Sequence, residues 1–318
     1  MNQKALHILE YHKIIEKLVD KAYNIPGIVF CRNLQPDTDL KVITMNQAHT
    51  RDALSRLFKK GSISFGGNKP VGRALSSLEI GSCLSAGELL IIAGLLENAN
   101  RIKTYGRKDR DDLPADTLDE FFNAIEPLSP VCREIRRCIL SEEEIADDAS
   151  AGLKHVRRSI KLTNDRIHSQ LNSMVNSSSM GAMLQDNLIT MRGGRYCLPV
   201  KAEYRSQVQG MIHDQSSSGS TLFIEPMAVV KLNNDMRELE LQEQKEIEII
   251  LSSLSQQIAE ERESIALNLS LMVQLDFIFA RAALAMEMNG SEPVFNDRGY
   301  INIKKGRHPL IDSKVVVP

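Results

Sequence analysis

The chain has 318 residues, of which 42% are hydrophobic and 25% charged, values typical of a globular protein with two or three structural units. Its formal net charge of −2 excludes a polycation, so any contact with nucleic acid must come from a local basic patch. Aromatic residues make up 5% and tryptophan is absent, which disfavours a platform that stacks the bases of single strands.

Cysteine spacing and the lack of apolar runs exclude several other classes of protein. The seven histidines lack metal-ligand spacing, and the five cysteines form no C-x-x-C pair, which indicates reduced thiols and no zinc site. Met1 to His7 lack the apolar core of a signal peptide. The longest strongly apolar run, Leu89 to Leu96, is far shorter than the ~20 residues of a membrane span. We therefore expect a cytoplasmic protein with no metal site and no membrane partner.

Helical periodicity dominates residues 1–147, which we assign to a helical core domain. Apolar residues from Leu6 to Val19 follow a helical stripe, which we expect to end at Asn24–Gly27. Pro36–Asp39 predicts the start of a second helix that stops near Gly61, and Ser85 can cap a third. Gly66–Pro70 and Lys108–Pro114 are predicted loops.

Two segments almost free of proline predict a pair of long helices. The outgoing helix occupies 148–187, with Asp147, Asp148 or Ser150 as its cap. The returning helix occupies 227–270, where Glu243 and Glu261 interrupt the apolar series and leave open one helix or two joined ones. Because a long helix with a narrow apolar stripe needs a partner, we expect an antiparallel arm, which rejoins the core at 271–299.

Residues 188–226, between the two helices, are predicted to form a small antiparallel sheet. Gly193-Gly194 suits a tight hairpin because glycine tolerates positive φ. The predicted strands are Leu188–Met191, Arg195–Lys201, Val208–His213 and Thr221–Ile224. A further strand is predicted at Tyr300–Ile303. The last residues, Val315 to Pro318, contain no turn or cap, so we expect the sequence to stop inside a longer protein.

The 188–226 segment resembles the second bacterial MutS family, whose members are paralogues of the mismatch-repair protein MutS with a C-terminal Smr nuclease module. The resemblance rests on Leu188–Glu203, His213–Ser216 and Phe223–Pro226, and it extends over essentially the whole chain. Further similar signatures are Tyr11–Ile15, Asp147–Ser150, Asp276–Ala280, Pro293 and Arg307–Pro309.

This resemblance implies a mainly α fold with a small antiparallel β insertion: a helical core, long antiparallel lever helices and a β-rich clamp at the tip. In the family an ABC-type ATPase domain follows, of which 300–318 would be the truncated start, and then the Smr endonuclease. Family members are homodimers, linked to suppression of homologous recombination on branched DNA and to ATP-driven splitting of collided ribosomes. The implied partners are branched or double-stranded DNA, ribosomal RNA and a second copy of the chain.

A phosphate-binding loop needs the string G-x-x-x-x-G-K-[ST], in which backbone N–H groups cradle the phosphates. The sequence contains no such string, and Gly67–Pro70 has neither the spacing nor the hydroxyl. The Smr module is also missing. We therefore expect this chain to bind no cofactor and to be no enzyme, whereas the full-length family member would bind ATP and Mg and act as ATPase and endonuclease.

Basic residues in the clamp segment are candidate phosphate contacts, namely Arg192, Arg195, Lys201 and Arg205. Because Glu203, Asp214 and Glu225 nearly balance their charge, spacing alone favours a mixed-charge solvated surface. With the family resemblance added, a clamp that binds nucleic acid and a solvated surface are equally favoured interpretations. The serine-rich stretch 215–221 lacks the context of a catalytic nucleophile and is predicted to be a loop.

A second basic cluster lies along one side of the outgoing helix by its spacing, and consists of Lys154, Arg157, Arg158 and Lys161. Pairing with the acidic stretch Glu238–Glu248 is favoured there over nucleic-acid contact. Two functions stay open: a nucleic-acid and ribosome clamp moved by ATP, or a dimerisation scaffold whose missing C-terminal modules handle nucleic acid.

Overall fold

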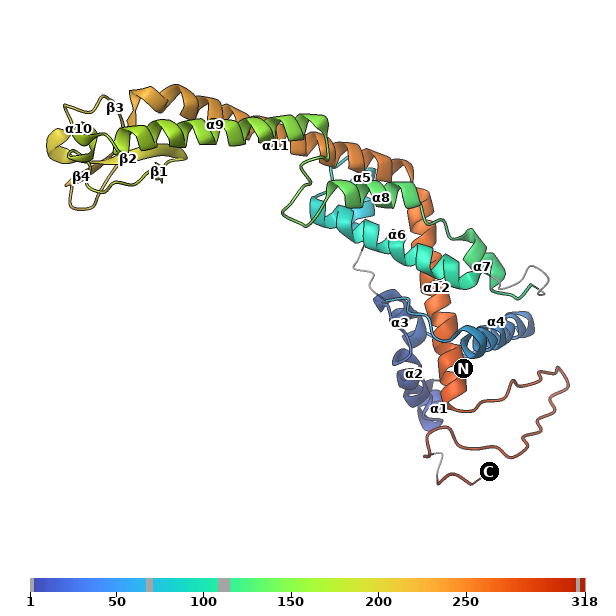
Figure 1. Cartoon of the computed structure of the whole chain (residues 1–318). Helices are drawn as coiled ribbons and strands as arrows, with labels where there is room; N and C mark the ends of the chain where they lie inside the picture. Colours follow the sequence, from blue (N-terminus) through green and yellow to red (C-terminus); the bar gives the residue numbers. More distant parts are fainter. Residues whose placement is uncertain (1–2, 67–70, 108–114, 313–314, 318) are drawn as a thin grey trace. The chain divides into compact units, whose positions relative to one another are not determined.

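The computed structural model describes residues 3–66, 71–107, 115–312 and 315–317 (Figure 1). The chain forms two compact units, Met1–Arg136 with Ser255–Pro318, and Arg137–Leu254. Helices dominate the described residues, and a four-stranded antiparallel sheet lies in the second unit, so the predicted fold class is confirmed. The predicted linker Lys108–Pro114 and most of the predicted loop Gly66–Pro70 lie outside the described residues.

The first unit is helical. Its helices are α1 (Gln3–Ile8), α2 (Tyr11–Val19), α3 (Ile25–Arg32), α4 (Leu40–Lys60), α5 (Gly72–Glu79), α6 (Ala86–Gly106), α7 (Asp119–Ala124), most of α8 (Ser129–Cys138) and α12 (Arg262–Glu287). Local caps fix several of their starts, as predicted. The Asp39 carboxylate accepts the backbone N–H groups of Lys41 and Val42, and Ser85 forms a capping box with Glu88.

Two predictions for the first helices are wrong. Asn24–Gly27 begins α3 instead of ending a helix, because the Asn24 side chain accepts the N–H of Gly27 at 2.6 Å and Pro26 needs no N–H in a first turn. The stripe from Leu6 to Val19 forms two helices, which are separated at Glu10 with its φ of 53°.

Helix α12 is the central element of the first unit and contacts α2, α3, α4, α6 and α7. By length and composition it is the one helix in the described part of the chain that could cross a membrane, yet 56% of its most apolar window is buried by the protein. Its fully buried Asp276 accepts the backbone N–H groups of Tyr23 and Asn24 at 3.0–3.2 Å. We conclude that α12 is a core helix that anchors the α2–α3 connection.

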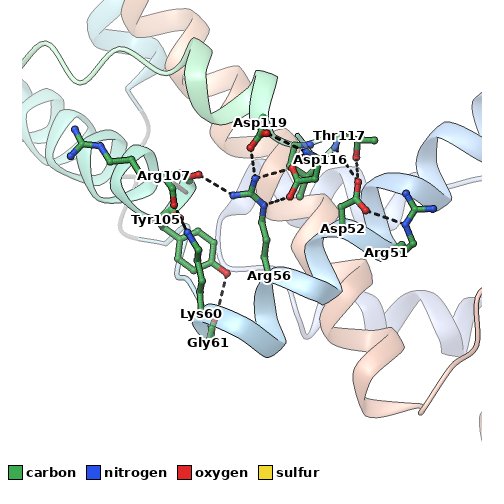
Figure 2. A network of polar contacts seen from close by, with 12 residues as sticks. Arg51, Asp52, Arg56, Lys60, Gly61, Tyr105, Arg107, Asp116, Thr117 and Asp119 are labelled. Carbon is green, nitrogen blue, oxygen red and sulfur yellow. Dashed lines mark hydrogen bonds and ion pairs between the residues drawn. The ribbon is translucent and has the colours of Figure 1, made fainter. Parts of the chain in front are cut away.

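A polar network joins α4 to the start of α7 (Figure 2). The guanidinium of Arg56 lies between Asp116 and Asp119, with N–O distances of 2.7–2.8 Å, and also donates to the carbonyl of Gly106. Arg56 stacks on Phe122, with its Cζ 4.7 Å from the ring centroid. This buried cation therefore ties the α6–α7 segment to α4.

Two long helices of the second unit run antiparallel, as predicted (Figure 1). Arg157 near the start of α9 (Ala151–Val175) lies 2.7 Å from Glu243, midway along α11 (Met227–Glu260), and the Ser150 cap donates to Glu246 at 3.1 Å. The helical series breaks at Glu261, between α11 and α12, and runs unbroken through Glu243. The short α10 (Ser178–Gly181) follows α9.

The sheet packs against α9 and α11 in the order β1 (Thr190–Arg192), β2 (Arg195–Lys201), β4 (Thr221–Pro226), β3 (Gly210–Gln215). Gly193 and Gly194, with φ of 58° and 74°, form the predicted hairpin turn. The predicted bounds of β2 are confirmed, whereas β3 begins two residues later than predicted. Leu198 and Val200 of β2 pack with Ile167 of α9 and Met236 of α11 in one apolar core.

The strand predicted at Tyr300–Ile303 is wrong. These residues have no strand or helix conformation, and Ile301 and Ile303 are 83% and 78% exposed. An isolated strand leaves its backbone donors and acceptors unpaired, and no strand of the described residues runs beside it. That residues 300–318 begin an ATPase domain stays a prediction.

Candidate nucleic-acid interface

The strand register decides which way the candidate basic residues point. Side chains alternate along a strand, so Arg195 and Lys201 project from the face opposite to Leu198 and Val200, which face the helices. Arg192 pairs directly with Arg195 across the β1–β2 hairpin and so shares that face. Three of the four predicted clamp contacts therefore share the face of the sheet opposite to Leu198 and Val200.

Arg192 of β1 is held at the surface by side chains of β3 and β4. Its Nε lies 3.1 Å from the Asp214 carboxylate on β3, and its Cζ lies 4.0 Å from the ring centroid of Phe223 on β4. Both charged side chains of the pair are exposed, so water screens the interaction. Asp214 therefore offsets much of the positive charge of Arg192.

Arg195 serves as the counterion of a buried acid. Its Nη1 lies 2.8 Å from Glu225, whose side chain has no solvent exposure, and its Nη2 donates to Asn234 at 2.6 Å. His213 Nε2 lies 2.6 Å from the other Glu225 oxygen, and Asn233 of α11 donates to the first at 2.8 Å. Because a buried carboxylate without partners is costly, Arg195 is committed to the fold.

Sequence reasoning missed this cluster, since it weighed Glu225 only as a surface acid. Alternation along β4 places Glu225 on the same face as Phe223, and nothing in that pattern signals burial. Glu225 is buried by a tertiary contact with α11. The Asn233 side-chain amide, which binds Glu225, also exchanges hydrogen bonds of 3.2 Å with the backbone of Tyr196 on β2. Burial, together with the Glu225 charge, raises the pKa of the neighbouring Cys197 to about 11, so this thiol stays neutral.

Lys201 and Arg205 keep their charge available. The Lys201 ammonium donates to the backbone carbonyl of Ala182 at 3.1 Å, and Arg205 donates to that of Val208 at 3.3 Å. Neither has an acidic partner within the described ranges of the chain. A carbonyl orients a cation without neutralising it, so these two residues remain able to meet phosphate oxygens.

The basic cluster on α9 divides in the same way. Arg157 forms ion pairs with Glu243 at 2.7 Å and Asp147 at 2.5 Å and donates to the Ile145 carbonyl. For this one residue the structure thus supports pairing with the returning helix. The other members are exposed and have no ion pair among the residues that the structure describes, namely Lys154, Arg158 and Lys161. They form an exposed basic face on α9.

The serine-rich loop between β3 and β4 is closed by its own hydrogen bonds. Thr221 N–H donates to the Ser216 hydroxyl at 3.0 Å, and the hydroxyls of Ser218 and Ser220 lie 2.8 Å apart. His213 is bound to Glu225 and to no serine, so the loop contains no nucleophile–base pair. In the part of the chain described, no group of three or more His, Cys, Asp and Glu residues could hold a metal ion.

These features define a mainly helical protein in which an antiparallel helix pair carries a small sheet, with Lys201 in β2 and Arg205 after it lacking an acidic partner among the described residues. No protein-family model matches the chain. Curated relatives match its whole length: the endonuclease MutS2 of Lachnoclostridium phytofermentans is 56% identical over 323 residues, and those of Agathobacter rectalis and Clostridioides difficile are 52% and 42% identical over 318 residues. The matches cover 100% of this chain and 40–41% of each relative. The chain thus belongs to the MutS2 family, as the 188–226 segment indicated, and spans about two fifths of the length of these relatives.

Proposed function

We propose that the second unit is the nucleic-acid-binding element of a MutS2-type ATPase that acts on branched or double-stranded DNA, where it limits homologous recombination, and on collided ribosomes, whose subunits it separates. The observation that carries this proposal is that five of the eight predicted basic contacts have no acidic partner in the described residues, namely Lys154, Arg158, Lys161, Lys201 and Arg205. Cations of this kind hold a phosphate backbone without reading its sequence, which suits both DNA and ribosomal RNA.

The surrounding structure supports a stiff lever. Helices α9 and α11 are joined by Arg157–Glu243 and Ser150–Glu246, and one apolar core continues from these helices into the sheet. A domain that changes shape with ATP could move such a lever as one body.

The catalytic steps are proposed for other parts of the protein. The matched relatives are named endonucleases, and this chain spans about two fifths of their length. We place ATP and Mg binding, and any nuclease activity, in segments that correspond to the remaining part of the relatives. The protein would act in the cytoplasm as a homodimer, with no membrane partner.

A scaffold role is the second candidate, and the pairs Arg192–Asp214 and Arg195–Glu225 favour it. Acidic partners therefore offset the positive charge of two of the four predicted clamp contacts. In this alternative the second unit positions two copies of the chain, and nucleic acid binds elsewhere.

Neutralising the unpaired cations separates the two candidates. We expect Lys201→Gln with Arg205→Gln, and separately Lys154→Gln with Arg158→Gln and Lys161→Gln, to weaken binding to four-way-junction DNA and to ribosomes. The slope of log affinity against log salt should fall by about 0.9 for each phosphate that the variant no longer neutralises. Fluorescence anisotropy over a salt series measures that slope.

The matched control is Lys41→Gln with Lys59→Gln, two exposed lysines of α4 in the first unit. It removes the same charge from the chain as the Lys201 and Arg205 pair and should leave the slope unchanged. If both sets of variants in the second unit keep the wild-type slope, the clamp proposal is wrong, and the scaffold role gains support when the dimer also persists.

A further inference from the structure

Charge is divided between helix α9 and the residues that lead into it. The exposed charged side chains of α9 are basic from Lys154 onward, with Asp165 as the one acid of this helix. Residues 139–148, which we call the acidic hairpin, carry acids that are all exposed, namely Glu142, Glu143, Glu144, Asp147 and Asp148. Both parts belong to the second unit, so an acidic and a basic surface adjoin within one compact body.

The position of the acidic hairpin beside α9 is fixed by backbone and side-chain contacts. A bridge between Ile139 and Ile145 closes the hairpin. Arg157 of α9 donates to the Ile145 carbonyl at 2.7 Å and pairs with Asp147 at 2.5 Å. The three consecutive glutamates Glu142–Glu144 have no ion pair among the residues that the structure describes. The hairpin therefore holds uncompensated negative charge next to the start of α9.

The basic face of α9 reaches further than the predicted cluster. Arg166 is exposed and has no ion pair within the described ranges. It follows Arg158 and the exposed Leu162 at intervals of four residues, which places all three on one side of the helix. From Lys154 to Arg166 the helix rises about 18 Å, the length of about five nucleotides of a duplex strand. The next residue, Ile167, packs in the apolar core that α9 shares with the sheet, so the basic face leads toward the sheet.

The acidic hairpin and the basic face act on phosphates in opposite directions. Salt screens charges over about 8 Å at physiological ionic strength. The hairpin carboxylates therefore repel phosphates near the start of α9, and this repulsion has decayed at Arg166, about 18 Å further along the helix than Lys154. Asp165 is a single acid on this face and leaves its net charge positive. A phosphate backbone is thus attracted from Lys154 toward the sheet and repelled in the other direction.

We propose that the exposed face of α9 is a track for the phosphates of one nucleic-acid strand, that it runs from Lys154 through Arg166 toward the sheet, and that the acidic hairpin is an electrostatic barrier at its other end. This inference rests on the proposed function and deepens it. It adds Arg166 to the phosphate contacts and gives the hairpin a role in placing the nucleic acid along the helix pair.

Charge neutralisation tests both ends of the track with four-way-junction DNA. Arg166→Gln should lower the slope of log affinity against log salt by about 0.9, and the control Arg133→Gln, at an exposed arginine of the first unit, should keep it. The triple substitution Glu142→Gln, Glu143→Gln and Glu144→Gln should raise the affinity about threefold to tenfold at about 50 mM salt. The gain should shrink at about 200 mM, because salt screens the repulsion that the variant removes.

The matched control for the barrier removes the same charge from three exposed acids of the first unit, through Glu16→Gln, Glu120→Gln and Glu263→Gln. It separates a local barrier from the effect of net charge, and its affinity should stay within about twofold of the wild type.

Two exposed leucines allow the path of the nucleic acid to be followed directly. Leu140 lies in the hairpin and is 58% exposed, and Leu162 lies on the track and is 49% exposed. With the photo-crosslinker p-benzoylphenylalanine in place of either leucine, Leu162 should give a crosslink to junction DNA and Leu140 should give none. In the background of the three glutamine substitutions, the probe at Leu140 should crosslink as well.

The outcomes distinguish this inference from the proposed function. The inference alone is overturned if neutralising Lys154, Arg158 and Lys161 weakens binding while Arg166→Gln keeps the wild-type slope, the variant of the three glutamates binds like the wild type, or the probe at Leu140 crosslinks as strongly as that at Leu162. If neutralising the three cations leaves binding unchanged and Leu162 gives no crosslink, the contact proposed for α9 fails and the track fails with it.

Discussion

Arg195 of β2 and Glu225 of β4 form an ion pair of 2.8 Å around a carboxylate that has no contact with solvent. The pair changes how the basic residues of the sheet are to be tested. A charge reversal at Arg195 would place two acids together inside the protein, so a loss of nucleic-acid binding would follow from damage to the fold. Lys201 and Arg205, which have no acidic partner in the described residues and donate to backbone carbonyls, are the informative positions.

Arg195→Met is expected to lower the free energy of unfolding by about 3 kcal/mol, because it leaves Glu225 buried without its guanidinium. Arg192→Met should cost at most about 1 kcal/mol, since its partner Asp214 is exposed. Urea denaturation followed by circular dichroism measures both values. Equal losses for the two variants would contradict the structural role assigned to Arg195.

The elements that the sequence predicts best are those with local causes. The Gly193-Gly194 turn, the Ser85 and Ser150 caps and the strand Arg195–Lys201 each depend on a few consecutive residues. The antiparallel helix pair was predictable because a narrow apolar stripe requires a partner.

Features with distant causes escaped prediction. Burial of Glu225 depends on Asn233 of α11, eight residues further along the chain and on another element. The start of α3 at Asn24 depends partly on Asp276, which accepts the Asn24 N–H from α12. Among the candidate cations, spacing alone could not separate Arg157, which Glu243 pairs, from its exposed neighbours. In each case the deciding partner comes from a different element of the fold.

Arg56→Met should be among the most destabilising single changes in the first unit. It removes the cation between Asp116 and Asp119 and leaves the Gly106 carbonyl without this donor (Figure 2). We expect a loss of about 3 kcal/mol in the free energy of unfolding. The control Arg51→Met, on the same helix but largely exposed, should cost no more than about 1 kcal/mol. A loss for Arg56→Met as small as that of the control would rule out the network as a major source of stability.

His49 should make stability depend on pH. Burial and the nearby charge of Arg281 lower its pKa from 6.5, so folded His49 binds a proton more weakly than unfolded His49. As pH falls below 6.5 the unfolded state takes up the proton first, and stability is lost until pH passes the folded pKa. We expect His49→Gln to reduce this loss, as urea midpoints across the acidic range would measure. The exposed control His155→Gln should keep the wild-type profile, and the same profile in His49→Gln would exclude His49 as its source.

Arg157 and Lys154 lie one turn apart on α9 and should give opposite results in two measurements. Arg157 joins Asp147, Glu243 and the Ile145 carbonyl, so Arg157→Met should lower the free energy of unfolding by about 1–2 kcal/mol. Lys154 is exposed, and Lys154→Met should change stability by less than about 0.5 kcal/mol. In binding to junction DNA the order reverses: Lys154→Met should lower the salt slope by about 0.9, and Arg157→Met should leave it unchanged. A reduced slope in the Arg157 variant alone would mean that its ion pairs open to bind nucleic acid, and the division of this helix into a structural and a binding side would then be wrong.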